Sequence, residues 1–135
     1  MSDLRSVTYV SRVTGSMSEA EFTLLGIEAG RFNALDGITG LLVFNGERFC
    51  QTIEGASAAI DDLLGRLRRD PRHDEFTVVN DEATETRRFR SWDMHLLVVP
   101  SDKQAALDLA RTRFEAEADY TARAKIYQTV ESAFA

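Results

Sequence analysis

The stretch G-L-L-V-F-N-G-E-R-F-C-Q-T-I-E-G, residues 40–55, decides the fold. Apolar residues fill positions 41–44, and a second strand-like run covers 48–54. Asn45-Gly46 between them is a dipeptide that tolerates the positive φ angles of a tight hairpin turn. We therefore expect an antiparallel hairpin here, entered at Gly40 and ended by Gly55.

A helix is expected on each side of this hairpin. Ser18 and Glu21 have the spacing of a capping box, and that helix should end near Asn33. Ser57 can cap the second helix, which Pro71 ends. The apolar residues at helical spacing are Phe22, Leu25, Ala29 and Phe32 in the first helix, and Ile60, Leu63, Leu64 and Leu67 in the second.

Three more strands and a helical tail complete the expected elements. The strands cover residues 4–10, 76–79 and 92–99, and the polar residues 80–88 form a loop or an extended connection. The strand at 92–99 is mostly apolar, so we expect it to be central or covered on both faces. Residues 102–134 predict one or two helices with two apolar stripes: Leu107, Ala110 and Phe114, then Tyr120, Tyr127, Val130 and Phe134.

The order of these elements predicts an α+β fold. The first six spell a ferredoxin-like βαββαβ sheet, to which the extra fifth strand is added. Right-handed crossovers place both crossover helices on one face, and the C-terminal helices should cover the outer sheet face. We expect a core at residues 1–100 and a helical cap or output segment at 101–135.

Composition excludes several classes of protein. The chain has 135 residues, 44% of them hydrophobic, and a net charge of −6, which disfavours direct nucleic-acid binding. One cysteine and two histidines offer no ligand set for a Cys-rich metal site, so we expect no metal. With no signal-peptide core and no apolar run of membrane-spanning length, we expect a cytoplasmic protein that does not enter a membrane.

Enzymatic motifs are sparse. A Walker loop, a G-x-G-x-x-G loop and a G-x-S-x-G nucleophile motif are all absent from the sequence. Asp70, Arg72 and His73 could form an anion-binding and acid–base cluster, so a ferredoxin-like small-molecule hydrolase is one interpretation. A purely structural dimerisation module is another.

Three polar residues fall inside expected core elements: Tyr9, Asn33 and Gln51. An unpaired buried amide costs on the order of 1–3 kcal/mol, so each residue must be hydrogen-bonded or face solvent. The pattern alone favours the simpler interpretation, in which Gln51 faces solvent and Asn33 caps its helix.

Five sequence blocks, taken together, favour a functional interpretation of these residues instead. They are L-x-x-x-x-Y-V-S (4–11), F-N-A-L-D-G-I-T-G-L-L (32–42), R-F-C-Q-T-I-E-G (48–55), D-P-R-H (70–73) and R-R-F-R-S-W-D-M (87–94). In order and spacing they resemble the BLUF family of blue-light receptors that use FAD. The resemblance covers residues 4–99 and agrees with the expected fold.

The resemblance implies a flavin ring between the two crossover helices, FAD being expected and FMN or riboflavin also acceptable. Tyr9 matches the redox-active tyrosine, Gln51 the switch glutamine, and Asn33 the asparagine at the carbonyl edge of the ring. The remaining cofactor residues that it implies are Asp70, Arg72 and His73 near the ring and its ribityl and phosphate arm, and Phe22, Leu25 and Phe32 as walls.

The resemblance also implies how the protein signals. Light drives electron and proton transfer from Tyr9, Gln51 rearranges by rotation or tautomerisation, and the flavin absorption shifts reversibly to the red. Trp92 and Met94, with the C-terminal helices, would pass the change to a downstream signalling protein. About 36 residues after Val99 are too few for a typical enzymatic output domain, so we expect a sensor and not an enzyme.

Two further expectations concern the outer sheet face. Apolar stripes in the tail suggest a homodimer formed through this face or through the C-terminal helices. Cys50 alternates away from Gln51, so it should lie on the outer side and form no flavin adduct.

Overall fold

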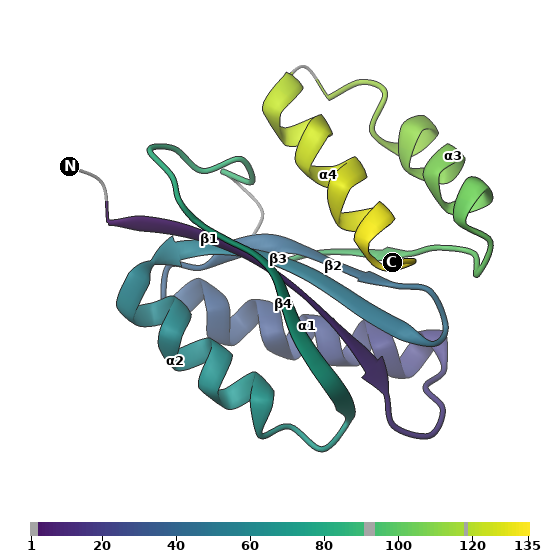
Figure 1. The fold of residues 1–135 in the computed structure, drawn as a ribbon, viewed down its shortest axis with the longest axis horizontal. Coiled ribbons are helices and arrows are strands. Elements are labelled where there is room, and N and C mark those ends of the chain that lie inside the picture. The colour runs from purple at the N-terminus through teal and green to yellow at the C-terminus, as the bar shows by residue number, and fades with distance from the viewer. Residues whose placement is uncertain (1–2, 91–93, 118) are drawn as a thin grey trace.

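The computed structural model describes residues 3–90, 94–117 and 119–135. Its strands are β1 (Leu4–Val13), β2 (Thr39–Phe44), β3 (Arg48–Ala56), β4 (His73–Ala83) and β5 (His95–Val98). Its helices are α1 (Glu19–Leu35), α2 (Ser57–Arg68), α3 (Lys103–Arg113) and α4 (Tyr120–Ser132). The sheet is the middle of three layers, with α1 and α2 on one face and α3 and α4 on the other (Figure 1).

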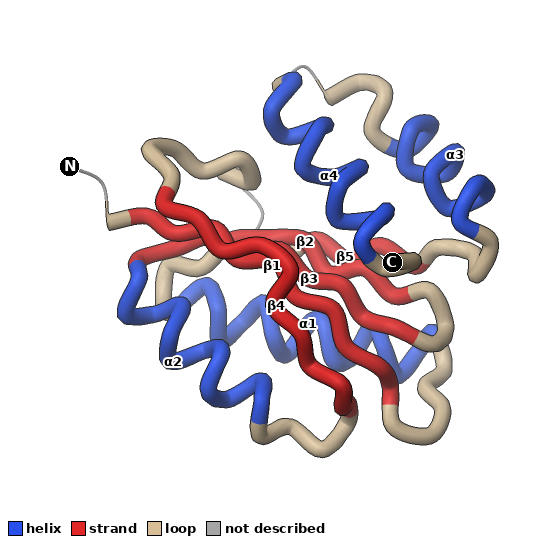
Figure 2. Tube along the Cα trace, in the orientation of Figure 1, coloured by secondary structure: helices blue, strands red, loops and turns tan. Residues whose placement is uncertain are grey.

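The sheet confirms the expected α+β, ferredoxin-like order. Its five strands are arranged β4-β1-β3-β2-β5, and β5 adds to β2 in parallel (Figure 2). The fifth strand was expected to be central or covered on both faces; β5 lies at the edge of the sheet, and the second alternative is the one observed. Leu96 packs in a cluster with Phe22 of α1, and Leu97 packs in a cluster with Ala110 of α3. Covering both faces explains its apolar sequence.

The end of β3 and the start of α2 differ from the expectation that Gly55 ends the strand and Ser57 caps the helix. Gly55 does not end the strand, because β1 continues alongside it and pairs Arg5 with Gly55 and Leu4 with Ala56. The N-cap of α2 is therefore Ala56, without a side-chain hydrogen bond, and Ser57 is the first helical residue. Backbone pairing in the sheet moved the helix start by one residue.

The last two strands also differ from expectation. β4 runs from His73 to Ala83, longer than the expected 76–79, and takes in part of the polar segment expected as a loop or an extended connection, because it pairs along most of β1. Its alternating burial is that of a half-exposed edge strand, which sequence hydrophobicity underestimates. β5 is described from His95 to Val98, and the expected start of the strand, at Trp92, lies outside the residues that the structure describes.

The hairpin and the start of α1 follow their sequence signals. Ser18 and Glu21 form the expected capping box, although α1 continues past Asn33 to Leu35. In the turn, Gly46 has a positive φ of 94°, but Asn45 does not share this conformation. Its Oδ1 instead accepts hydrogen bonds from the backbone N–H groups of Glu47 and Arg48, at 3.0 and 2.7 Å.

The hydrophobic core is divided by the sheet. On the outer side, one cluster joins the sheet to α3 and α4; its buried members include Val43, Cys50, Phe114, Ile126 and Val130. The C-terminal helices thus cover the outer face, as expected. Tyr120 is 74% exposed and does not belong to the apolar stripe expected for it.

On the inner side, two separate clusters lie under the crossover helices. Ile53, Ile60 and Leu64 represent the cluster under α2, and Phe22 and Phe44 the cluster under α1. Because the inner core is split in this way, a space is left between the helices. Among the described residues, no helix is both long enough and apolar enough to cross a membrane.

Candidate functional site

A buried phenol–amide pair stands at the centre of the inner sheet face. Tyr9 on β1 is the direct cross-strand neighbour of Gln51 on β3, so both side chains point to the same face. Tyr9 Oη donates a hydrogen bond to Gln51 Oε1 at 2.6 Å, and each residue is only 3% exposed. Gln51 therefore does not face solvent; its strand lies in the interior of the sheet, where polar side chains need partners.

Tyr9 is held in its protonated form. Burial raises the pKa of its phenol well above the ordinary value, because the charged phenolate would lose its hydration. Phe76 stacks on the ring, with centroids 4.5 Å apart. Tyr9 is thus available as a hydrogen-bond donor in a fixed orientation.

The amide nitrogen of Gln51 lacks a strong partner. Gln51 Nε2 lies 3.3 Å from Met94 Sδ, and a thioether is a weak acceptor. Met94 packs against both inner clusters, and so connects the amide to the segment that leads into β5. The pair can also exchange its pattern: if the amide turns over, Nε2 faces Tyr9 and Oε1 faces away.

Asn33 brings a second unsatisfied amide to this region. Its backbone carbonyl accepts hydrogen bonds from the N–H groups of Asp36 and Ile38, at 3.1 and 2.8 Å, which fixes the end of α1. Its side chain is 2% exposed, and Nδ2 has no hydrogen-bond partner among the described residues. A buried donor without a partner is rare in folded proteins and suggests a missing ligand.

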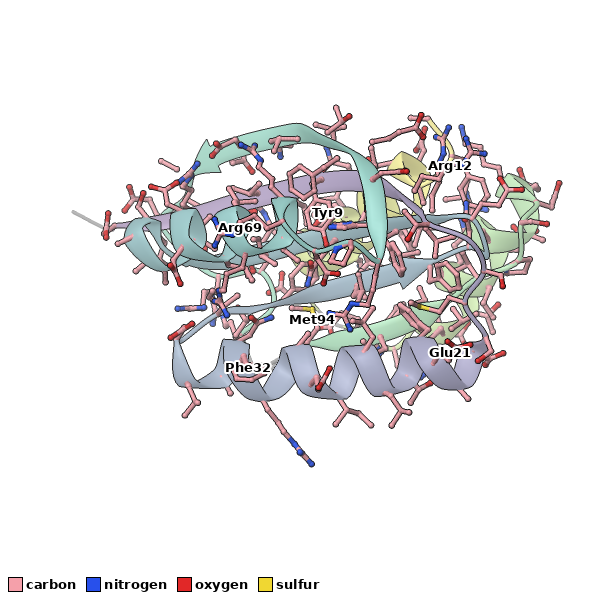
Figure 3. All side chains as sticks on the ribbon, turned by 90° about the horizontal axis from the view of Figure 1, so that it is seen from below. Tyr9, Arg12, Glu21, Phe32, Arg69 and Met94 are labelled. Atoms are coloured by element: carbon pink, nitrogen blue, oxygen red, sulfur yellow. The ribbon has the colours of Figure 1, made fainter. Side chains whose placement is uncertain are left out.

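These groups line one cavity, here called the α1–α2 pocket, with a volume of about 210 Å³. Small-molecule sites typically measure about 300–1,000 Å³, so it suits part of a ligand, such as a flat ring, better than a whole nucleotide. Figure 3 looks onto this side of the sheet and labels Tyr9, Phe32 and Met94, which come from β1, α1 and the segment before β5. The lining residues are Tyr9, Leu25, Glu28, Ala29, Phe32, Asn33, Leu42, Phe49, Gln51, Leu63, Arg66, Leu67, Asp70, Arg72 and His73.

The expected wall residues divide into two groups. Leu25 and Phe32 line the pocket, and Phe32 keeps 58% of its surface exposed at the rim. Phe22 does not line it, because its ring is buried against Phe44 at a centroid distance of 5.2 Å. Sequence reasoning missed Phe49, which strand alternation places on the same face as Gln51.

Asp70, Arg72 and His73 all reach the pocket, but in a form that does not favour a hydrolase. Arg72 Nη2 and Nε donate to the Asp70 carboxylate at 2.6 and 3.0 Å, and these bonds hold the pKa of Asp70 below its usual value. Both ring nitrogens of His73 are engaged, with Ser11 Oγ at 2.7 Å and the Leu67 carbonyl at 2.6 Å. Neither the carboxylate nor the imidazole is left free as a general base.

Cys50 lies away from this pocket. It is fully buried in the outer cluster, on the face opposite Gln51, as strand alternation predicts. Burial raises the pKa of its thiol to about 12, so it carries no thiolate near neutral pH.

Comparison with known proteins finds relatives of this chain. A family model described as "Sensors of blue-light using FAD" matches residues 4–95. Photoactivated adenylate cyclase subunit beta from Euglena gracilis is 36% identical over 88 residues, which make up 65% of this chain and 10% of that protein. The blue light- and temperature-regulated antirepressor BluF from Escherichia coli is 28% identical over 92 residues, or 64% of this chain and 23% of that protein. The chain thus spans only a small part of these relatives.

Solved structures match over nearly the whole chain. The dark-state structure of the BLUF protein BlrB has a TM-score of 0.74 and 32% identity, with 98% of each chain covered. The structure named BlrP1 BLUF has a TM-score of 0.78 and 27% identity, covering 99% of this chain and 90% of that one. The C-terminal helices are therefore included in the similarity.

Proposed function

The chain belongs to the BLUF family, the sensors of blue light using FAD, and we propose that it holds the isoalloxazine ring of FAD in the α1–α2 pocket and signals the absorption of blue light. The observation that carries this proposal is the pairing of Tyr9 with Gln51 beside the unsatisfied amide of Asn33. FMN and riboflavin carry the same ring and are compatible with the same groups.

The residues present fit a flavin ring. The apolar part of the pocket, from Leu25, Phe49 and Leu63, suits the flat faces of an aromatic system. The ring edge carries carbonyl oxygens, which accept hydrogen bonds, and Asn33 Nδ2 and Gln51 Nε2 are donors that lack a strong acceptor. The pocket is therefore matched to the ring in both shape and polarity.

Tyr9 is the electron donor in this proposal. A bound flavin that has absorbed blue light is a strong oxidant. Tyr9 would give up an electron and then its Oη proton to the flavin, since the oxidised phenol is strongly acidic, and both would return to it afterwards. The buried phenol starts protonated, as its raised pKa requires, so the sequence of steps has the same starting state over a wide pH range. No net chemical change results.

Gln51 is the switch. While Tyr9 has lost its proton, the Oε1 acceptor of Gln51 loses the hydrogen bond that fixed the amide. Rotation or tautomerisation of the amide then changes which donor and acceptor it presents to Tyr9 and to Met94. When the proton returns, the new pattern persists until it relaxes in darkness, and a changed hydrogen bond at the ring edge shifts its absorption.

Met94 is the first residue of the output path in this proposal. It contacts Gln51 Nε2, and methionine can change its packing at modest cost. Exchange of the amide removes this contact and alters the packing of Met94, which leads into β5; Leu97 of β5 packs in the outer cluster with α3 and α4. We expect a downstream protein to respond to this change; Trp92, expected to take part, lies outside the described residues.

The test is the visible absorption spectrum of the purified protein in darkness, after blue light and during recovery. A flavin spectrum with a small, reversible red shift is expected. Tyr9→Phe should retain the flavin and lose the shift, whereas the matched control Tyr127→Phe, on α4 at the outer cluster, should keep it. A protein that stays colourless with added FAD, or a Tyr9→Phe variant that photocycles normally, would contradict the proposal.

A further inference from the structure

A second hollow lies on the other side of α1 from the α1–α2 pocket, between that helix and β5. Its lining includes Ile27, Gly30, Arg31 and Leu35 of α1, with Met94 and Leu96 on the side of β5. Figure 3 shows α1, marked by Glu21 and Phe32, along one margin of the molecule, with Met94 beside it. We call this hollow the α1–β5 groove.

The groove follows a strand edge that has no partner. β5 is the last strand of the sheet, and the Val99 N–H donates to the Phe44 carbonyl of β2 at 2.9 Å. Because backbone groups point alternately to the two sides of a strand, those of Leu96 and Val98 point away from β2. They have no backbone hydrogen-bond partner within the part of the chain that the structure describes. Such an edge can pair with another extended chain.

The helix beside this edge turns apolar surface toward solvent. Ile27 is 47% exposed and Leu35 is 85% exposed, and both line the groove. Gly30 leaves the groove open above Met94, since a Cβ added there would lie 3.7 Å from Met94 Cβ, an ordinary contact. Gly26 is where helix and strand touch, because an added Cβ would collide with the β5 side chain that faces it. The groove therefore has a closed floor and an open apolar wall.

Arg31 gives this apolar groove a single charge. Of the lining residues that the structure describes, it is the only charged one. It forms no ion pair with any described residue. A carboxylate on the occupant of the groove would balance the guanidinium through charge-assisted hydrogen bonds.

The shape of this margin favours a single extended segment over a second copy of the chain. An antiparallel pair of β5 strands about a twofold axis would place both copies of α1 on the same face of the joined sheet. Each α1 already lies along the margin beside β5 (Figure 3), so the two helices would compete for the space next to the paired edges. One added strand needs only the edge and the groove.

We infer that the α1–β5 groove is the docking site for an extended segment of the downstream protein, with apolar residues at alternate positions and an acidic residue among them. The inference rests on the proposed function, which supplies the light signal. The main chain of the segment would pair with Leu96 and Val98, its inward side chains would cover Met94, and its carboxylate would reach Arg31. Since Met94 Sδ also lies 3.3 Å from Gln51 Nε2, the docked segment would touch the residue next to the switch.

The experiment uses a panel of capped heptapeptides with valine, isoleucine or leucine at alternate positions, one aspartate between them and a red-emitting label. Fluorescence anisotropy measures their binding to the flavin-loaded full chain, in darkness and under blue light. We expect members of the panel to bind with a Kd below about 1 mM. In a peptide that binds, N-methylation of one alternate set of amides should weaken binding about tenfold, and methylation of the other set should not.

Three variants test the groove itself. Arg31→Gln should weaken the aspartate peptide several-fold, whereas the same peptide with asparagine should bind equally to both proteins. Leu35→Gln should weaken every peptide, and Leu24→Gln is its matched control, because Leu24 is exposed on α1 but does not line the groove. Each variant should retain the flavin and its red shift, which shows that it is folded.

The affinity of the wild type should differ about fivefold or more between darkness and blue light. The docking site is wrong if no peptide of the panel binds, if both methylated sets bind equally, or if Leu35→Gln binds as Leu24→Gln does; a red shift in the same samples leaves the proposed function intact. Equal affinity in darkness and light overturns the readout through Met94. A wild type without a red shift overturns the proposed function, while binding in darkness still tests the groove.

Discussion

Replacing Thr52 with valine is expected to loosen α4 from the sheet. Three buried hydroxyls join the outer face to that helix: Thr8 Oγ1 lies 2.7 Å from Thr52 Oγ1, which lies 2.7 Å from Thr129 Oγ1. Thr129 donates its proton to the Lys125 carbonyl at 2.6 Å. Since each hydroxyl has one proton, Thr52 must donate to Thr129 and Thr8 to Thr52, which gives the chain a single direction.

The magnitude follows from the bonds lost. Valine has the shape of threonine, so Thr52→Val opens no cavity, but it removes the bonds from Thr8 and to Thr129. Each buried hydrogen bond contributes about 1 kcal/mol, and the Thr8 donor, 2% exposed, loses its acceptor. We expect a loss of about 2–3 kcal/mol in the free energy of unfolding. Thr129→Val should cost less, because the Lys125 carbonyl is in a helix and still accepts its backbone hydrogen bond.

Urea unfolding of the full chain in darkness, followed by circular dichroism, measures this loss. Thr77→Val is the matched control: Thr77 is exposed on β4, and its replacement should change the free energy by less than about 0.5 kcal/mol. Combining Thr52→Val with Thr129→Val should cost less than the sum of the single changes, since both remove the bond that they share. If the effects add fully, or if Thr52→Val matches Thr77→Val, the directed hydroxyl chain is refuted.

Three further outcomes are expected. Burial, reinforced by Arg113, holds the pKa of His95 below its ordinary value of 6.5. As pH falls, the unfolded chain therefore binds the proton first, and the free energy of unfolding should decline below about pH 6.5. His95→Gln should flatten this dependence of the free energy on pH in urea titrations between about pH 5.5 and 7.5. Cys50→Ala should leave the light-induced red shift qualitatively intact, because Cys50 lies across the sheet from Gln51, and loss of the shift would contradict this placement. In Gly40→Ala, the added Cβ would overlap the Thr52 carbonyl oxygen, which cannot move aside because its strand is paired. The substitution should lower the free energy of unfolding by an amount on the order of 1–3 kcal/mol and so lower the melting temperature. An unchanged melting temperature would refute the close approach.

The sequence predicted those parts of the fold that depend on local signals. The capping box at Ser18 and the hairpin around Gly46 act within a few residues, and both were found where expected. The strand ends were misplaced because they depend on pairing with distant residues. Gly55 remains in β3 because Arg5 lies opposite it, and β4 is long because β1 is long.

The site divides in the same way. Tyr9, Asn33 and Gln51 could be named from motifs, but strand alternation alone favoured a solvent-facing Gln51, and helix position alone favoured a cap for Asn33. Only the sheet register placed Tyr9 Oη against Gln51 Oε1, and only the end of α1 buried Asn33 Nδ2 without a partner. Phe22 was expected to line the pocket but lies in the core beside it, because helical spacing alone cannot distinguish these two positions.

By itself, the sequence determined which residue types could exchange hydrogen bonds and on which element each would lie, because periodicity and capping are local properties of the chain. The tertiary structure decided which of them meet. The α1–α2 pocket and the Thr8–Thr52–Thr129 chain each join segments far apart in the sequence. Such contacts depend on strand register and helix packing, in which a shift of one residue turns a side chain to the opposite face.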